Sequence, residues 1–332
     1  MKKFLFALLI FLESCTTNPF DVDVEKISGE FNFIPFHYAL DTVKAQNIYD
    51  DMKQLEKNYG DFSDFYFCQI LQLGNPESAG FVDKLDEFID YCNANSVFTD
   101  VRKTFSDTIA LKKMFEQGVK HYRYYFPNEQ VPDVFTIVSG FQESAFPTDG
   151  IVALSLEKYL GSNYPAYANL GFTNYERKKM VKEMLPVDLF KTIALIKYPK
   201  DEKYACDLIS EMIYQGRLQY FLNAILPNTA DSLRWGYTNI QYLWVEKYEE
   251  DIWNVLVDKK LLFITDVHEI RKFTGDGPFT TPFGNHSSPG CATFCGYKIV
   301  KSYMKNNPKI SLEQLMEIKN MMDIYNNARY NP

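Results

Sequence analysis

The sequence predicts an α+β domain that is predominantly α-helical, with a small sheet and a buried central helix. Three observations support this fold class. Of the 332 residues, 46% are hydrophobic, including 27 Phe and 23 Tyr, so a large core can be buried. Apolar residues recur at helical spacing over most of the chain. Only a few short segments have the β-branched and aromatic composition that is typical of strands.

The first half of the predicted domain, which spans residues 31–332, contains the expected strands. Phe31–Leu40 is rich in aromatic and β-branched residues and is the first candidate. Residues 41–125 follow with apolar residues at helical spacing. Val134–Phe141 is the clearest strand, because it is a short, bounded run rich in β-branched residues. Gly150–Gly161 reads as another strand that leads into a turn of helix.

The second half of the predicted domain is helical apart from one long loop. Residues 173–199 are expected to form a helix that Pro186 interrupts. Asp207–Pro227 is the central helix, and 238–263 is a strongly amphipathic helical stretch. The Gly-, Pro- and Ser-rich segment 275–290 is too long for an ordinary connection, which favours a functional loop. The final 40 residues are expected to form two helices.

The N-terminus has the features of a bacterial lipoprotein. It begins MKKFLFALLIFLESC, with two Lys, an apolar run and then a Cys after a small residue. Residues 1–14 are therefore expected to be a signal peptide, and Cys15 is expected to carry a lipid. Residues 15–30 would tether the domain to the membrane. An ordinary secreted protein with a Cys near its cleavage site is the alternative.

Composition also excludes several classes of protein. The net charge is −8, whereas nucleic-acid binding needs clustered Lys and Arg, so no nucleic-acid partner is expected. After the N-terminus, no segment approaches 18 continuous apolar residues, which disfavours a transmembrane span. Five Cys remain after Cys15, without C-x-x-C spacing, which disfavours a disulfide framework or a zinc ribbon. Cys291 and Cys295 are expected to be buried free thiols.

The central helix is apolar or aromatic on almost every side, so it is expected to be buried. Gly216 lies inside this helix and lowers its intrinsic stability by about 1 kcal/mol relative to Ala, which indicates a neighbouring backbone packed closely against it. Glu211 and Arg217 need partners if they are buried. Because they are six residues apart, each is expected to find its partner elsewhere in the fold.

The same helix also invites comparison with a zinc peptidase motif. Zinc peptidases use H-E-x-x-H on a buried helix, and the aligned residues here run from Ser210 through Glu211 to Tyr214. Only the Glu is present. The four His of the chain show no H-x-x-x-H pair, so no metal and no cofactor are expected.

Two further sets of residues are candidates for function. Glu143 and Asp149 could join Glu211 in a carboxylate cluster of the kind that glycoside hydrolysis needs. The candidate residues of a polar cleft or network are therefore Glu143, Asp149, Ser210, Glu211, Tyr214, Arg217 and Tyr220. The candidate residues of the loop and its end are His286, Ser288 and Cys291.

The order of these motifs resembles the gliding-motility lipoprotein family of Bacteroidetes that is called GldB. The resemblance covers roughly residues 30–330 and is carried by LISEMIYQGRLQYFLNAILP and by SSPGCATFCGYKIVKSYM. The helix positions that match the family pattern are Met212, Ile213, Tyr214, Gly216, Arg217 and Tyr220. One departure lies after the loop. The family reads S-P-G-R, whereas Cys291 stands in the place of the Arg.

The resemblance implies a cell-envelope lipoprotein, needed for motility in gliding relatives and associated with the type IX secretion apparatus. The family is distantly similar to predicted zinc peptidases. The resemblance therefore implies a degenerate zincin-like fold, with Ser210 and Tyr214 where the metal-binding His would stand. It also implies lipid anchoring through Cys15, on the periplasmic side or at the outer membrane.

Three functional hypotheses follow from the residues and the resemblance. The favoured one is a non-catalytic envelope lipoprotein that binds a partner protein or a peptide, with the 275–290 loop covering a polar network around Glu211. The second is a metal-free hydrolase in which Glu211 acts with Glu143 or Asp149 as acid and base. The third is a lipoprotein that binds glycans through exposed aromatic residues.

Overall fold

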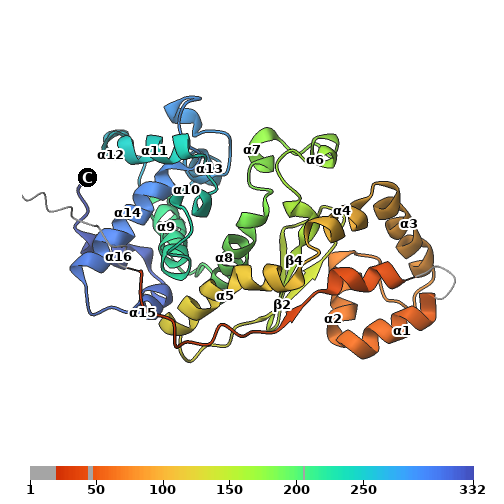
Figure 1. Cartoon of the computed structure of the whole chain (residues 1–332). Helices are drawn as coiled ribbons and strands as arrows, with labels where there is room; N and C mark the ends of the chain where they lie inside the picture. Colours follow the sequence, from red (N-terminus) through yellow and green to blue (C-terminus); the bar gives the residue numbers. More distant parts are fainter. Residues whose placement is uncertain (1–19, 44–47, 205) are drawn as a thin grey trace, which may run out of the picture.

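A computed structural model describes residues 20–43, 48–204 and 206–332, and the predicted signal peptide and Cys15 lie outside these ranges. The described part is predominantly helical with one four-stranded sheet, which confirms the predicted α+β class (Figure 1). In Figure 1 the sheet and helices α1–α4, α6 and α7 occupy one side, and α9–α16 occupy the other. Helices α5 and α8 lie between the two sides. The buried apolar side chains form one continuous cluster that runs through both.

The sheet is mixed and has the strand order β1-β2-β4-β3. Strand β1 pairs in parallel with β2, β2 pairs in parallel with β4, and β3 is antiparallel to β4. The bounds of the strands are β1 Phe33–Ile34, β2 Asp133–Ile137, β3 Ala145–Thr148 and β4 Ile151–Ser155. Strands β3 and β4 form a hairpin around Asp149 and Gly150, whose φ of +67° suits the Asp-Gly turn preferred in tight hairpins.

The predicted strands are partly correct. The expected strands at 134–141 and 150–161 correspond to β2 and β4, and the turn of helix expected after the latter is the 3-10 helix Leu156–Tyr159. The strand expected over 31–40 is wrong beyond two residues, because the 3-10 helix Phe36–Thr42 follows β1. Strand β3 was not predicted, since its sequence AFPT contains a Pro, which usually argues against a strand.

The helices that precede the sheet fill the predicted helical region between residues 41 and 125. They are α1 Ile48–Tyr59, α2 Asp61–Asp64, the π-helix Phe65–Ile70, α3 Phe81–Ala94, α4 Val97–Thr104 and α5 Thr108–Tyr125. Two short helices, α6 Pro165–Asn169 and α7 Asn174–Arg177, and the 3-10 helix Lys182–Met184 lead from the sheet to α8 Leu185–Lys197. The expected Pro186 interruption is wrong. This Pro lies in the first turn of α8, where its missing N–H is harmless, so it begins the helix.

The helices of the other side surround α9 Leu208–Ile225, which is the predicted central helix. They are α10 Asp231–Arg234, α11 Asn239–Lys247, α12 Glu249–Asp258, α13 Val267–Thr274, α14 Cys291–Asn306, α15 Leu312–Glu317 and α16 Met321–Ala328, with a 3-10 turn at Thr281–Phe283. The stretch 238–263 therefore contains two helices that meet at Tyr248. The final 40 residues contain α15, α16 and most of α14, so the expectation of two helices was wrong.

Helix α9 crosses α14 with the two backbones in contact. A Cβ atom built on Gly216 would lie 2.3 Å from the carbonyl carbon of Gly296 and 2.3 Å from the amide nitrogen of Tyr297. A Cβ on Gly296 would lie 1.8 Å from the carbonyl oxygen of Met212. No other residue type fits at either position without moving a helix. The close approach predicted from Gly216 is confirmed.

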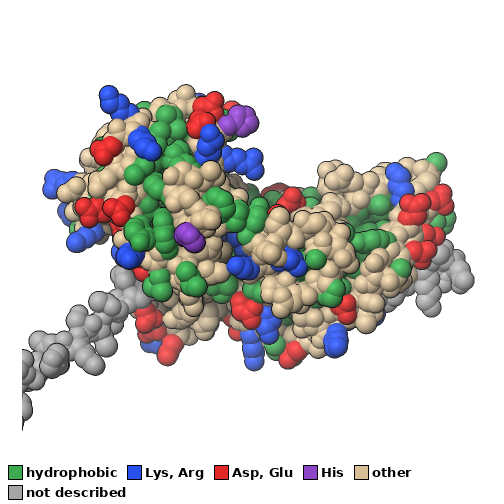
Figure 2. Space-filling view, turned by 90° about the horizontal axis from the view of Figure 1, so that it is seen from above, with side chains coloured by type: hydrophobic (Ala, Val, Ile, Leu, Met, Phe, Trp, Pro, Cys, Tyr) green, Lys and Arg blue, Asp and Glu red, His purple; other side chains and the backbone are tan. Residues whose placement is uncertain are grey.

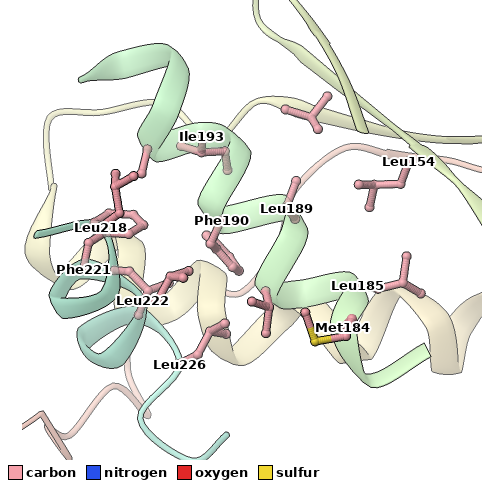
Figure 3. Packing of buried hydrophobic residues seen from close by; sticks show 14 of the residues in the cluster. Leu154, Met184, Leu185, Leu189, Phe190, Ile193, Leu218, Phe221, Leu222 and Leu226 are labelled. Atoms are coloured by element: carbon pink, nitrogen blue, oxygen red, sulfur yellow. The ribbon is translucent and has the colours of Figure 1, made fainter. Parts of the chain in front are cut away.

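Helix α9 is also packed tightly against α8. Figure 3 shows Phe190 of α8 on the side of that helix that faces Leu218, Phe221 and Leu222 of α9. Phe190 and Phe221 are 0% exposed. With α14 on another side, α9 is enclosed by helices, which confirms its predicted burial.

The segment that precedes strand β1 also packs against α9. Phe20 is 8% exposed, and its ring meets the ring of Tyr220 edge-on with the centroids 5.0 Å apart. Val24 is 7% exposed. Part of the expected tether therefore packs onto the helices before the chain reaches β1.

Candidate functional site

Four of the predicted site residues line one cavity beside α9. Ser210, Glu211, Tyr214 and Arg217 contribute to a cavity of about 350 Å³, which we name the Arg217 cavity. Their spacing of one, four and seven residues places them on the same side of the helix. Its walls are completed by Pro199, Lys200, Asp201, Glu202, Tyr204 and Cys206 of the preceding loop and by Ile318, Lys319 and Met321.

The first turn of α9 is fixed by its N-cap. The side chain of Asp207 accepts a hydrogen bond from the backbone amide of Ser210 at 3.0 Å. An Asp in this position satisfies an amide that would otherwise lack a helical partner. The cap holds the residues that follow, beginning with Ser210 and Glu211, in a defined register against the cavity.

Both carboxylate oxygens of Glu211 are engaged. One oxygen forms an ion pair with the ammonium group of Lys200, and the other accepts a hydrogen bond from the Gln215 amide at 3.1 Å. The Glu211 side chain is 12% exposed, whereas that of Lys200 is 49% exposed. The partner expected for this buried acid is therefore a Lys from the loop before α9, and the pair is electrically neutral.

Arg217 is buried without a carboxylate partner among the residues that the structure describes. It is 2% exposed, and one terminal nitrogen donates to the carbonyls of Met316 at 3.0 Å and Ile318 at 2.5 Å. Its Nε has no acceptor in the described part of the chain. Burial lowers the pKa of Arg217 to about 10, so the group remains charged at neutral pH.

Tyr214 lies between the two cations of the cavity. The guanidinium carbon of Arg217 is 5.4 Å from the centre of its ring, and the Lys200 ammonium is 5.2 Å from it. Its hydroxyl donates to the carbonyl of Tyr198 at 3.2 Å, and burial raises its pKa. The aromatic ring therefore stabilises the positive charge of Arg217, which has no carboxylate partner among the described residues.

The structure places the other predicted cleft residues elsewhere. Tyr220 lies on another side of α9, with its ring 6.4 Å from that of Tyr297. Glu143 is exposed and lines a different cleft, described below. Asp149 is exposed at the β3–β4 turn. The Arg217 cavity contains neither Glu143 nor Asp149 in its walls.

The 275–290 loop closes on itself through internal hydrogen bonds. Thr280 and Ser288 are joined twice, since both the amide and the hydroxyl of Thr280 donate to the Ser288 carbonyl. The Ser288 hydroxyl donates to the Gln241 carbonyl at 2.5 Å, and His286 is exposed. The loop contributes Asp276, Pro289 and Gly290 to the second cleft and nothing to the Arg217 cavity.

Cys291 occupies the position where the family pattern has Arg. It is 0% exposed, its amide donates to the Thr280 hydroxyl at 3.1 Å, and burial raises its pKa to about 12. Cys291 and Cys295 are both buried free thiols, as predicted. A thiol with a raised pKa is a poor nucleophile, so the geometry gives Cys291 a packing role.

A second and larger cleft of about 480 Å³ lies on the opposite side of α9, between α7 and α8 on one side and α10, α13 and α14 on the other. We name it the central cleft, and Figure 2 shows the molecule hollowed between its two sides. Gln219 and Thr293 each present a buried side-chain oxygen that has no partner among the described residues. The Tyr159 hydroxyl donates to Asp188 at 2.6 Å, and burial raises the pKa of Asp188.

Sequence reasoning missed these residues of the central cleft. Asp188 reads as an ordinary acid in the first turn of a helix, which favours negative charge there. Gln219 and Thr293 lie 74 positions apart in the chain and share no motif. Only the crossing of α9 and α14 brings them to one surface.

The described residues contain no group of three or more His, Cys, Asp or Glu that could hold a metal ion. The fold and the site thus define a class: a mainly helical α+β protein whose buried central helix presents a neutralised Glu and an unpaired Arg to a cavity. The chain belongs to the family described as gliding motility protein GldB, whose model matches residues 17–332.

No curated protein and no solved structure gives a significant match. The zincin-like relation therefore remains a prediction. Family membership associates the chain with gliding motility and, as a lipoprotein family, with the cell envelope. Within the described ranges, no helix is both long and apolar enough to cross a membrane.

Proposed function

We propose that this protein is a lipid-anchored envelope lipoprotein that binds a segment of a partner protein in the Arg217 cavity and performs no catalysis. The observation that carries this proposal is the state of Glu211. Its two oxygens are occupied by Lys200 and Gln215. A cavity open to solvent and walled by a neutralised acid, an aromatic ring and a buried cation has the composition of a binding site.

The hydrolase alternative has less support from the geometry. A general base must lie within hydrogen-bond reach of the proton that it takes, and hydrolysis by two carboxylates needs both beside one substrate bond. Glu143 lines the central cleft, and Asp149 lies at a hairpin turn, whereas Glu211 lines the Arg217 cavity. Neither acid is placed to act with Glu211 on one bond.

The anchoring part of the proposal rests on the N-terminal pattern and on Phe20. A signal peptide at 1–14 would leave Cys15 as the lipidated first residue, with 15–30 as the tether. Phe20 is buried against Tyr220 of α9. Five residues reach at most about 18 Å, so a lipid on Cys15 would hold this end of α9 close to the membrane surface.

A cross-linking experiment tests partner binding. A photo-crosslinking amino acid is placed at Tyr204, which lines the cavity and is 45% exposed, and separately at Ile109, which is 69% exposed on α5. We expect one envelope protein to be cross-linked from position 204 and not from 109. Ser210→Trp, which fills the cavity, should abolish that adduct while circular dichroism shows a folded protein. An adduct that persists with the cavity filled contradicts the proposal.

The absence of catalysis has its own test. Wild type and Glu211→Gln are compared on peptide and glycan substrate libraries. We expect equal, background rates for both, because the Gln side chain keeps the size of the Glu. Hydrolysis by wild type that Glu211→Gln loses would establish the hydrolase instead.

Glycan binding is a second candidate, and the central cleft favours it. Polyhydroxylated ligands need paired donors and acceptors beside an aromatic ring, and this cleft offers the unpartnered oxygens of Gln219 and Thr293 beside Trp235. A glycan array probed with wild type and Thr293→Val decides this. Hits that the Val variant loses support the candidate, and an array without hits rejects it.

A further inference from the structure

We infer that the Arg217 cavity is a site for a single carboxylate attached to an apolar group, the chemistry found at the C-terminus of a polypeptide. This inference rests on the proposed binding function and names its ligand. Three features of the cavity support it. The first is the charge of Arg217, the second is its hydrogen-bond donors that have no acceptor among the described residues, and the third is the chemistry of the other residues that line the cavity.

The first step is the charge of Arg217. A buried guanidinium is strongly destabilising unless an anion or hydrogen-bond acceptors compensate for lost water. The other buried arginine, Arg234, has Asp231 as its ion partner. Within residues 20–43, 48–204 and 206–332, Arg217 has only two backbone carbonyls and the Tyr214 ring as partners. The fold therefore leaves a positive charge at the wall of a cavity.

The second step concerns the donors. A guanidinium has five N–H groups in a planar fork that matches the two oxygens of a carboxylate. The hydrogen bonds from Arg217 to the carbonyls of Met316 and Ile318 both use one terminal nitrogen, and its Nε–H finds no acceptor in the described residues. Such a fork binds carboxylates bidentately when one is supplied. An entering carboxylate would thus complete the hydrogen bonding of Arg217.

The third step concerns the remaining walls. Tyr214, Ile318 and Met321 are apolar surfaces beside the guanidinium, so they suit an apolar group next to the carboxylate. Lys200 is already paired with Glu211, and Lys319 is exposed. The acids Asp201 and Glu202 also line the cavity. Their charge disfavours a multiply charged anion such as phosphate and leaves a single carboxylate as the better ligand.

The size of the cavity favours a chain end over a through-running segment. Its volume of about 350 Å³ is near the lower limit of ligand sites, which range over roughly 300–1,000 Å³. A C-terminal residue supplies a carboxylate and an apolar side chain on one carbon atom. An internal Asp or Glu supplies only the carboxylate, on a polar stem that the apolar walls do not favour.

The experiment titrates wild-type protein with four probes and follows the ¹⁵Nε–¹H signals of its arginines by NMR. The probes are an acetylated tripeptide ending in phenylalanine with a free carboxylate, its C-terminal amide, an amidated tripeptide with an internal Asp, and inorganic phosphate. We expect the free carboxylate to shift the Arg217 signal and to bind at least about tenfold more tightly than its amide, since a charge-assisted hydrogen bond is lost in the amide.

Equal affinity for the free and amidated peptides would overturn the inference, as would tighter binding of phosphate or of the internal Asp. Arg217→Gln should remove the preference for the free carboxylate, whereas Lys319→Gln, which removes an exposed charge at the same cavity, should change it less than threefold. If Arg217→Gln does not fold, the NMR titration of wild type with the four probes still tests whether the cavity prefers a free C-terminal carboxylate. If a partner protein is cross-linked from position 204 but the free carboxylate is not preferred over the amide, the proposed binding function is supported and only this inference is rejected.

Discussion

Two buried ionisable side chains, each without an ion partner in the described part of the chain, lie on opposite sides of this molecule, and their surroundings differ. Glu157, on the side of the sheet, is 0% exposed. One of its oxygens accepts three hydrogen bonds, from the amide and hydroxyl of Ser139 at 2.7 and 2.8 Å and from the amide of Phe141 at 3.0 Å. Arg217, on the helical side, is 2% exposed and forms one wall of a cavity.

These different surroundings distinguish a buried ionisable group that stabilises the fold from one that lines a candidate ligand site. Phe141 has a φ of +66°, which is unfavourable for a residue with a Cβ atom, and Glu157 holds it there. The acid therefore fastens the loop after β2 from within the core. Arg217 fastens the residues around α15 through two carbonyls, but its remaining donors lie beside a cavity. Burial alone does not distinguish the two roles.

Replacing Glu157 should have the largest effect. Glu157→Leu would leave the amides of Ser139 and Phe141 buried without acceptors, so we expect the free energy of unfolding to fall by roughly 4 kcal/mol. Chemical denaturation measures this. Glu157→Gln is the matched control, because its amide oxygen can still accept these bonds, and it should lose less than half as much. Equal losses would show that the charge itself, and not its acceptor oxygen, holds the loop.

Replacing Gly216 tests how Arg217 is positioned. The methyl group of Gly216→Ala would meet the α14 backbone, so we expect a loss of roughly 3 kcal/mol, at the upper end for overpacked sites. The shift of α9 should expose Arg217 and leave the Glu157 loop unchanged in hydrogen exchange. Gly118→Ala is the control, since its new methyl group would first meet the ring of Phe190, a side chain that can rotate, and not a helix backbone, so it should cost less. A tolerated Ala at 216 would contradict the backbone contact.

Replacing Arg217 should affect stability far less than replacing Glu157. Arg217→Met removes two hydrogen bonds to carbonyls but also removes a buried charge, and an apolar residue of similar size often offsets such a loss. We expect a decrease of about 1 kcal/mol in the free energy of unfolding, measured by denaturation under the same conditions. A decrease as large as that of Glu157→Leu would assign Arg217 a mainly structural role.

The smallest effect is expected from pH. Burial raises the pKa of Glu157 above its ordinary value, so the folded state holds the proton more tightly than the unfolded state. Binding of this proton contributes fully to the free energy of unfolding at pH values below the pKa of the unfolded state, about 4.3. That contribution is lost as the pH rises through the pKa of the folded state. We therefore expect the stability advantage of wild type over Glu157→Gln to shrink above pH 4.3. An advantage that grows with pH would mean a lowered pKa.

The sequence allowed much of the helical side to be predicted, for reasons that lie in particular residues. The near-uniform apolar surface of α9 required burial, and Gly216 required a close backbone. The strands were harder. Strand β1 has only two residues, and β3 contains Pro147, which is tolerated because β3 is an edge strand. Neither gives a periodic signal of useful length.

The candidate site was only partly accessible from the sequence. Ser210, Tyr214 and Arg217 were named as candidates, and helical spacing places them on one side of α9, because local periodicity fixes which residues share a side. It did not reveal that Lys200 would neutralise Glu211, since that contact depends on how the preceding loop folds back. The central cleft was missed, because its Gln219 and Thr293 come together only through a helix crossing.

The seating of Phe20 on Tyr220 has a mechanical consequence. If the chain is held at its N-terminus, a pulling force enters the folded part at Phe20 and passes directly to α9, through a ring contact four residues beyond Gly216. The close backbone contact of α9 and α14 then passes part of that load to a second long helix. Force applied at the anchor would thus be borne by the α9–α14 pair before it reached the sheet.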